Sequence, residues 1–220
     1  MATLGELISE GSATTKLLLH LNGDATDSSG NGNNGTSSNI TYSLANGRFG
    51  QGAGFNGTNS YISTGLDLKN ITKTIIAWVK PTGTAFGVIV NQWYAPASWE
   101  FFLDASNHLS YASYNGSSVS SVTSTIVLST GVWYMVAVSY NASNNLANIY
   151  INGAIAGSAT LSVEESTSAS NGMWLGRENG STVYSPFNGS IDEVIISNTA
   201  WSATKIAKYY AMAKGRWATI

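Results

Sequence analysis

Large aromatic side chains are concentrated in one short segment of the chain. Trp93, Tyr94 and Trp99 lie within seven residues of one another, around a proline. Sugars present C–H faces that stack on aromatic rings, and a few polar side chains beside such rings supply specificity. Glu100 is a nearby carboxylate, and Asn91 and Gln92 add amides to the same segment. The pattern predicts a glycan-binding or partner-binding surface formed by Trp93, Tyr94, Trp99 and Glu100.

Trp99 also has a second interpretation. It alternates with Phe101 and Leu103, which is typical of a strand that turns one face toward the core. A core role is an alternative for Trp93 and Tyr94 as well. The sequence leaves both interpretations open.

Carboxylates that could act as a catalytic pair are few. Glycosidases need two carboxylates about 5–5.5 Å or 6.5–9.5 Å apart. Glu100 and Asp104 share a face of one strand, but the strand rise separates them by about 13 Å. Glu164 and Glu165 are adjacent, so on an extended segment their side chains point apart. We therefore predict a protein that is not an enzyme.

Composition excludes several other classes of function. Ten basic and twelve acidic residues give a formal net charge of −2, which does not favour nucleic-acid binding. No apolar run approaches the roughly 20 residues of a membrane helix, so we expect no membrane insertion. The chain has no cysteine, which excludes disulfides. The first residues lack the basic and apolar regions of a signal peptide.

The elements that must position these side chains are short strands. Apolar runs with period-two alternation recur along the chain and are separated by clusters of Asn, Gly and Ser. They lie at 15–22, 72–81, 86–93, 98–105, 108–114, 121–128, 131–141, 146–153, 172–177 and 189–197. Asn152-Gly153 and Asn115-Gly116 suit type I′ hairpins because both residue types tolerate a positive φ. We therefore predict an all-β fold, a two-sheet antiparallel sandwich.

One helix is predicted near the C-terminus. Ser202 can cap a segment in which Ile206, Tyr209, Tyr210 and Ala213 share one face. The expected organisation is an N-terminal arm at 1–15, one sandwich domain at 16–214 with this short C-terminal helix, and a tail at 215–220.

The order of the motifs resembles a laminin G-like jelly roll of the concanavalin A-like lectin/glucanase superfamily. The resemblance covers roughly 16–212. It rests on the ordered series LLLHLNGDATDSSGNGNNG (17–35), GRFGQGAGFNGTNSYI (47–62), IIAWVKP (75–81), GVWYMVAVSYN (131–141), IYING (149–153), WLGR (174–177), FNGSIDEVIIS (187–197) and WSATKIAKYY (201–210). It implies an antiparallel jelly-roll sandwich in which Trp78 and Trp133 are packing residues.

The resemblance also implies a structural calcium ion that ties the first strand to a late one. The late ligand would be Asp192, and the early ligands would come from Asn22, Asp24 or backbone carbonyls. Asn22 stands where the family usually has Asp, which removes a charge from this set. The alternative is that Asp192 bonds a turn and that Asp24 forms an Asx turn.

We expect a non-catalytic binding or structural module at a virion surface or in an extracellular setting. Relatives usually work outside cells, yet this sequence shows no export signal and no cysteine. A head decoration, fibre or tail protein of a phage would satisfy both observations. Its partners would be a host-surface glycan, a neighbouring virion protein, or further copies bound through the terminal arms. The alternative is a lectin domain of a secreted glycan-active enzyme, or a glycoside hydrolase.

Overall fold

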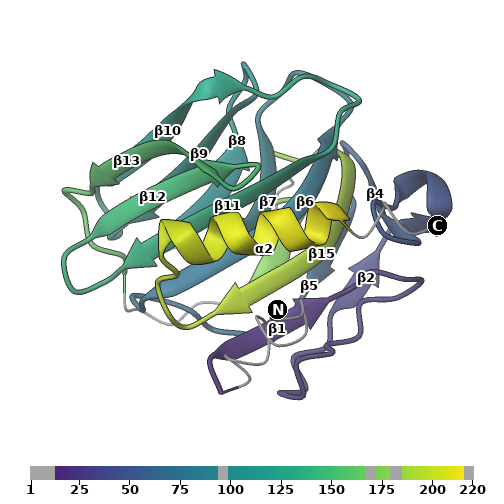
Figure 1. Ribbon diagram of the computed structural model, residues 1–220, viewed down its shortest axis with the longest axis horizontal. Coiled ribbons are helices and arrows are strands. Elements are labelled where there is room, and N and C mark those ends of the chain that lie inside the picture. Colours follow the sequence, from purple (N-terminus) through teal and green to yellow (C-terminus); the bar gives the residue numbers. More distant parts are fainter. Residues whose placement is uncertain (1–12, 94–98, 167–171, 179–184, 216–220) are drawn as a thin grey trace.

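Two antiparallel β-sheets pack face to face in the computed structural model, which describes residues 13–93, 99–166, 172–178 and 185–215 (Figure 1). Sheet A has the order β13 (Ala154–Thr160), β12 (Leu146–Ile151), β11 (Tyr134–Asn141), β6 (Lys73–Pro81), β15 (Asn188–Ser197), β4 (Gly52–Asn56) and β3 (Thr41–Ser43), with β1 (Thr15–Leu19) paired to β15. Sheet B has the order β10 (Val119–Val127), β9 (His108–Tyr114), β8 (Trp99–Leu103), β7 (Gly87–Asn91), β14 (Trp174–Leu175), β5 (Tyr61–Ser63) and β2 (Thr36–Ser38). The predicted all-β jelly-roll sandwich with one C-terminal helix is confirmed.

The main core lies between the two sheets and is built by alternation along the strands. On β8, Phe101 and Leu103 are buried in this core. On β6, Ile75, Ala77 and Val79 occupy the facing layer. Removal of this apolar surface from water is the main force that holds the sheets together.

A second apolar layer lies on the outer face of sheet A, under helix α2 (Ala203–Gly215). The helix begins where predicted, because the Ser202 hydroxyl accepts a hydrogen bond from the Lys205 backbone N–H at 3.2 Å. Ile206 and Tyr209 are buried against sheet A, where Trp78 packs with them. Trp133 is half-buried against the same cluster. Among the described residues, no helix is long and apolar enough to cross a membrane.

The two predicted hairpins differ in their turns. Asn152 and Gly153 both have a positive φ, 51° and 80°, as a type I′ turn between β12 and β13 requires. The turn between β9 and β10 is longer than predicted, because the Asn115 N–H donates to the Ser118 carbonyl and only Gly116 takes a positive φ. Residues 1–12 and 216–220 of the predicted arms lie outside the described residues.

Candidate functional site

The outer face of sheet B carries a row of side chains from five neighbouring strands. Strand pairing sets Ala112 opposite Glu100, Glu100 opposite Asn91, Asn91 opposite Trp174, and Trp174 opposite Ser63. Directly opposed residues project from the same face of a sheet. This row therefore lies on the face that points away from the core.

An aromatic stack stands at one side of the row. The rings of Trp93, just after β7, and Tyr114, on β9, lie 5.2 Å apart at 25°. The Trp93 backbone N–H donates to the Asn91 side-chain oxygen at 2.9 Å. The Asn91 amide in turn donates to the Arg177 carbonyl at 2.6 Å. The buried Asn91 thus holds two backbone segments in place: the one at Trp93 and the one at Arg177, which follows β14.

A second aromatic stack stands at the other side. The rings of Tyr61, on β5, and Trp174, on β14, lie 4.3 Å apart at 11°. The Arg177 guanidinium lies 4.7 Å from the Tyr61 ring and 5.0 Å from the Trp174 ring. A cation over an aromatic face is attracted by the ring quadrupole, so Arg177 holds both rings in place.

Glu100 lies on β8, between β7 and β9, and is almost fully buried. Its side-chain oxygen Oε1 has no hydrogen-bond partner in the described part of the chain. Burial raises the pKa of Glu100 well above its ordinary value, and the nearby Glu178 raises it further. Burial also raises the pKa of Glu178, although the Ser185 hydroxyl donates to Glu178 Oε1 at 3.0 Å and opposes that shift. Burial thus favours the protonated form of Glu100, in which its carboxyl can donate a hydrogen bond.

The structure separates the predicted glycan residues. Trp93 and Glu100 both belong to the outer face of sheet B, as part of the site described above. Trp99 points to the other side, has no exposed surface and packs in the core with Tyr111, so it offers no ring to a ligand. Tyr94 lies outside the described residues.

Three aromatic residues of this face were not predicted as site residues: Tyr61, Tyr114 and Trp174. They come from strands far apart in the sequence and meet only through strand pairing. Trp174 belongs to the WLGR motif, which indicated the fold but not the face that its ring occupies.

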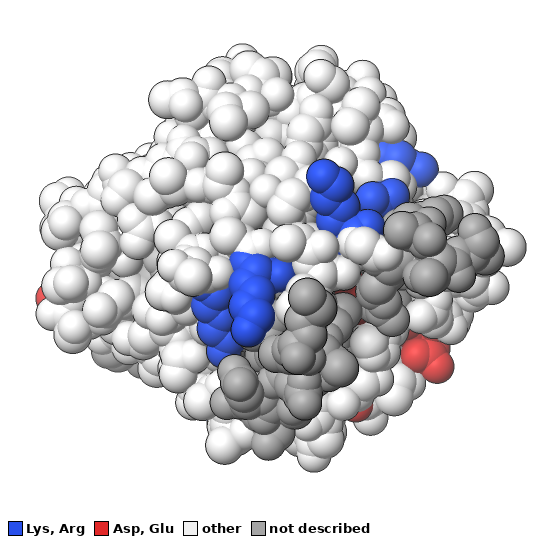
Figure 2. Space-filling model, viewed as in Figure 1, with Lys and Arg blue, Asp and Glu red and all other residues white. Residues whose placement is uncertain are grey.

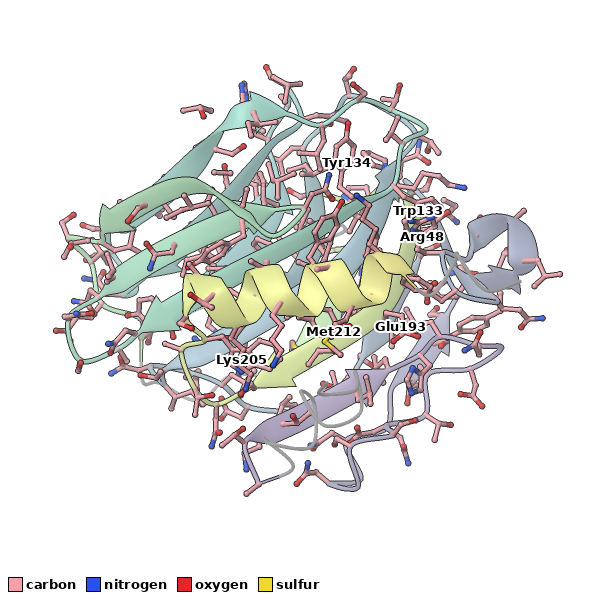
Figure 3. The ribbon with its side chains drawn as sticks, viewed as in Figure 1. Arg48, Trp133, Tyr134, Glu193, Lys205 and Met212 are labelled. Atoms are coloured by element: carbon pink, nitrogen blue, oxygen red, sulfur yellow. The ribbon has the colours of Figure 1, made fainter. Side chains whose placement is uncertain are left out.

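Asp192 lies on the opposite sheet and anchors a loop. Its Oδ2 accepts hydrogen bonds from the backbone N–H groups of Arg48 at 2.7 Å and Phe49 at 2.9 Å. Its Oδ1 accepts from the Glu193 N–H at 2.9 Å. The loop lies on the side of sheet A that α2 covers, as the labelled Arg48 and Glu193 show (Figure 3).

The side-chain oxygens of the other predicted calcium ligands also accept hydrogen bonds from backbone N–H groups. Asn22 Oδ1 accepts from the Gln51 N–H at 2.9 Å, and Asp24 Oδ1 accepts from the Thr26 N–H at 2.9 Å, which is an Asx turn. Three backbone N–H groups donate to the Asp192 carboxylate. A calcium ion is surrounded instead by six to eight oxygen ligands. No group of three His, Cys, Asp or Glu within the described ranges could hold a metal. The structure thus shows protein hydrogen bonds on all three side chains, and a calcium ion at these residues stays a prediction.

Comparisons with known proteins agree on the fold. A family model described as the concanavalin A-like lectin/glucanases superfamily matches residues 55–207. No curated protein matches the chain. Among solved structures, domain 4 of AbnA, an extracellular GH43 arabinanase from Geobacillus stearothermophilus in complex with arabinotriose, is 23% identical with a TM-score of 0.70; the match covers 90% of this chain and 98% of that one.

Toxin binding domains are also similar in structure. The binding domain of Paraclostridial Mosquitocidal Protein 1 is 15% identical with a TM-score of 0.73, and the match covers 90% of this chain and 52% of that one. The botulinum neurotoxin type G receptor binding domain is 17% identical with a TM-score of 0.71, and the match covers 90% of this chain and 51% of that one. The chain thus spans about half the length of these toxin domains.

Proposed function

The chain belongs to the concanavalin A-like lectin/glucanase superfamily, and we propose that it is a non-catalytic carbohydrate-binding module. The observation that carries this proposal is the pair of aromatic stacks, Trp93–Tyr114 and Tyr61–Trp174, on the outer face of sheet B. All four rings are half-buried, so each is held in place and keeps an accessible edge or face. Preorganised rings of this kind suit the C–H faces of successive sugar units.

The polar groups of the site favour an uncharged oligosaccharide. In its protonated form, which burial favours, Glu100 can donate a hydrogen bond to a sugar hydroxyl, and the Glu178 carboxyl can accept one. The Arg177 guanidinium and the Glu178 carboxyl are sequence neighbours at this site, so their opposite formal charges offset each other and favour an uncharged ligand. The arabinotriose bound to the similar arabinanase domain supports an oligosaccharide as the class of ligand.

Titration calorimetry against neutral oligosaccharides, chosen from a glycan array, tests the proposal. We expect Trp93→Ala and Trp174→Ala each to weaken binding about fivefold, since a stacked ring contributes roughly 1 kcal/mol. Trp133→Ala is the matched control, because this half-buried Trp packs on the opposite sheet. The proposal fails if no array sugar binds, or if the two site variants bind as tightly as the control.

A second candidate function is glycoside hydrolysis, favoured by one observation. Glu100 has the raised pKa of a general acid, and Glu178 lies close enough to contribute to it. Reducing-sugar release from a polysaccharide panel separates the two functions. We expect none from the wild-type protein; release that disappears in Glu100→Gln would establish an enzyme.

The proposed setting for a glycan-binding module is outside the cell, where glycan surfaces are presented. A virion surface, with neighbouring virion proteins as partners, is our more specific proposal. Mass spectrometry of purified phage particles tests it, because the chain must then copurify with the particle at a fixed ratio to the capsid protein. Recovery of the chain only in the particle-free medium would contradict it.

A further inference from the structure

A groove opens on the outer face of sheet A, at the end formed by β15, β4 and β3. Strand pairing sets Ser190 opposite Gly54, and Gly54 opposite Thr41. Phe55, the next residue on β4, is buried in the main core, so this row of three residues faces outward. The groove has a volume of about 430 Å³, which lies within the range of small-ligand pockets.

Neutral polar side chains line this groove. The lining includes the carboxamides of Asn46, Asn56 and Asn188 and the hydroxyls of Thr41, Thr82 and Ser190. Among the described residues that line it there is no Asp, Glu, Lys, Arg or His. We call it the amide groove.

Asn46, the last residue of the short helix η1 (Leu44–Asn46), is held firmly at the amide groove. Its side-chain amide donates to the Thr41 carbonyl at 2.9 Å, and its Oδ1 accepts from the Ser190 hydroxyl at 3.1 Å. A Cβ at position 54 would lie 2.3 Å from Asn46 Nδ2, so the glycine there makes room for this carboxamide. A carboxamide NH₂ has two donor hydrogens, and the second one remains for a ligand.

Asn188 supplies a further donor from β15. Its Oδ1 accepts a hydrogen bond from the Thr82 hydroxyl at 2.9 Å, and its Nδ2 bonds no residue in the described part of the chain. Gly57, with a φ of 67°, packs against this side chain, and a Cβ there would lie 2.7 Å from Asn188 Cβ. Both Asn46 and Asn188 are therefore positioned before a ligand arrives, which reduces the entropy cost of binding.

We infer that the amide groove is a second binding site, which takes a single uncharged sugar unit. A sugar carries several hydroxyls, each of which donates and accepts, and carboxamides and hydroxyls complement both functions. The site lies on the opposite sheet from the two aromatic stacks, so its occupancy does not depend on them. The groove offers one compact position, whereas the stacks suit successive units of a chain.

Charge favours a neutral ligand over an ionised one. An ionised ligand in the amide groove would lose part of its hydration without gaining a counter-charge from the lining. Lys80 pairs with Ser190 in register, but its ammonium donates to the Ala45 carbonyl at 2.9 Å and lies 5.3 Å from the Trp133 ring. Figure 2 shows that the Lys and Arg side chains of the visible face gather over and beside α2. An anionic ligand would be attracted to those cations.

A nuclear magnetic resonance titration of the isotope-labelled full chain tests the inference. The probes are the methyl glycosides of glucose, galactose, mannose and arabinose, each raised to about 50 mM, above the millimolar dissociation constants expected for one sugar unit. We expect at least one probe to shift the Asn188 side-chain amide and the backbone amides of Gly54 and Gly57 in a saturable way. Glucuronic acid should leave these signals unchanged.

Two matched variants locate the binding. Asn188→Ala should raise the dissociation constant at least about fivefold, read from the Gly54 and Gly57 amides, since one hydrogen bond to the sugar is lost. Asn148→Ala is the control: Asn148 also accepts one hydroxyl hydrogen bond, from Ser158 at 2.7 Å, but lies on β12, and its loss should leave binding unchanged. The spectrum of each variant also shows whether it is folded.

A double variant separates this site from the glycan-binding face. Trp93→Ala/Trp174→Ala should retain the shifts at the amide groove, so a failure of the aromatic site would leave this inference intact. Absence of any shift at the groove amides with all four probes would overturn it. Equal affinities of Asn188→Ala and Asn148→Ala, or loss of the shifts in the double Trp variant, would do the same.

Discussion

At the scale of single residues, the strongest constraint is an ion pair inside the core. Lys73 Nζ lies 2.6 Å and 2.7 Å from the two Glu165 oxygens, and neither side chain is exposed. The Tyr111 hydroxyl and the Asn70 backbone N–H also donate to this carboxylate. The Lys73 ammonium lies 4.8 Å from the centre of the Trp99 ring. Burial lowers the pKa of Lys73 and raises that of Glu165, and each partner opposes the shift of the other.

Removal of one partner of this pair should be far more damaging than removal of both. Lys73→Met leaves a buried carboxylate without its cation, and we expect it to lower the free energy of unfolding by about 3–5 kcal/mol. The double variant Lys73→Met/Glu165→Gln should recover part of that loss in urea denaturation. The control is Lys69→Met, which breaks a pair with the half-exposed Asp67 and should cost less than about 1 kcal/mol. Equal losses in the single and double variants would show that the charge imbalance is not the cause.

Asp192 predicts a pH dependence of stability. Burial raises the pKa of Asp192 from 3.8 to about 7, against the opposing effect of the N–H groups of Phe49 and Arg48. Between about pH 4 and pH 7 the folded protein therefore holds a proton that the unfolded chain has released. The contribution of this carboxyl to stability is fully present below pH 4 and is lost as the pH rises toward 7.

The matching experiment compares the wild-type protein with Asp192→Asn, which cannot ionise. We expect urea denaturation to show the free energy of unfolding of the wild type falling relative to that of the variant from pH 4 to pH 7. A constant difference across this range would mean that Asp192 is ionised throughout, stabilised by its three backbone donors.

At the scale of elements, helix α2 stabilises the outer layer of sheet A. Ile206 has no exposed surface and packs in the same cluster as Trp78 and Met135. Ile206→Ala should lower the free energy of unfolding by about 2–5 kcal/mol, since it removes buried methyl groups and leaves a cavity. Lys208→Ala, on the exposed face of the same helix, should change it little. Similar urea midpoints for the two variants would show that α2 does not stabilise the sheet.

Helices and strands with a clear periodic pattern of apolar residues could be predicted from the sequence, and short strands without such a pattern could not. The alternation in His108–Tyr114 and the Ser202 cap correspond to observed boundaries. The strands β2, β3 and β5 have three residues each, too few to show a period, and β4 is rich in glycine. These strands form because their partners are already in place, which is information that single segments do not carry.

The residues of the candidate site were likewise only partly predictable from the sequence. Trp93 was predicted because it belongs to a local cluster of aromatic residues. Tyr61 and Trp174 were not, since their contact depends on the pairing of β5 with β14. Trp99 and Glu100 are neighbours in sequence, but alternation sends one to the core and the other to the outer face of sheet B. The packing of the two sheets decides which of these two side chains lies in the core and which lies on the outer face.

At the scale of the whole molecule, hydrogen bonds join the chain after the first strand to a late strand, and this has a measurable consequence. The predicted calcium ion would join the first strand to a late one, and two hydrogen-bonded links join the same two parts of the chain. Asn22 and Asp192 both hold the loop around residues 48–51, through Gln51, Arg48 and Phe49. This loop thereby connects the chain after β1 to β15 without an ion.

A thermal melt with and without a chelator tests this conclusion. A ligand that binds only the folded state raises its stability, so removal of a structural calcium ion would lower the melting temperature. We expect the same melting temperature in 1 mM calcium and in excess EDTA, and a much lower one for Asp192→Ala in both buffers, because the variant leaves buried N–H groups without an acceptor. A wild-type protein that melts several degrees lower in EDTA would show that the carboxylate binds an ion after all. In that case Asp192→Ala should also abolish the response to EDTA, whereas Asp24→Ala, an exposed Asx-turn residue, should leave it unchanged.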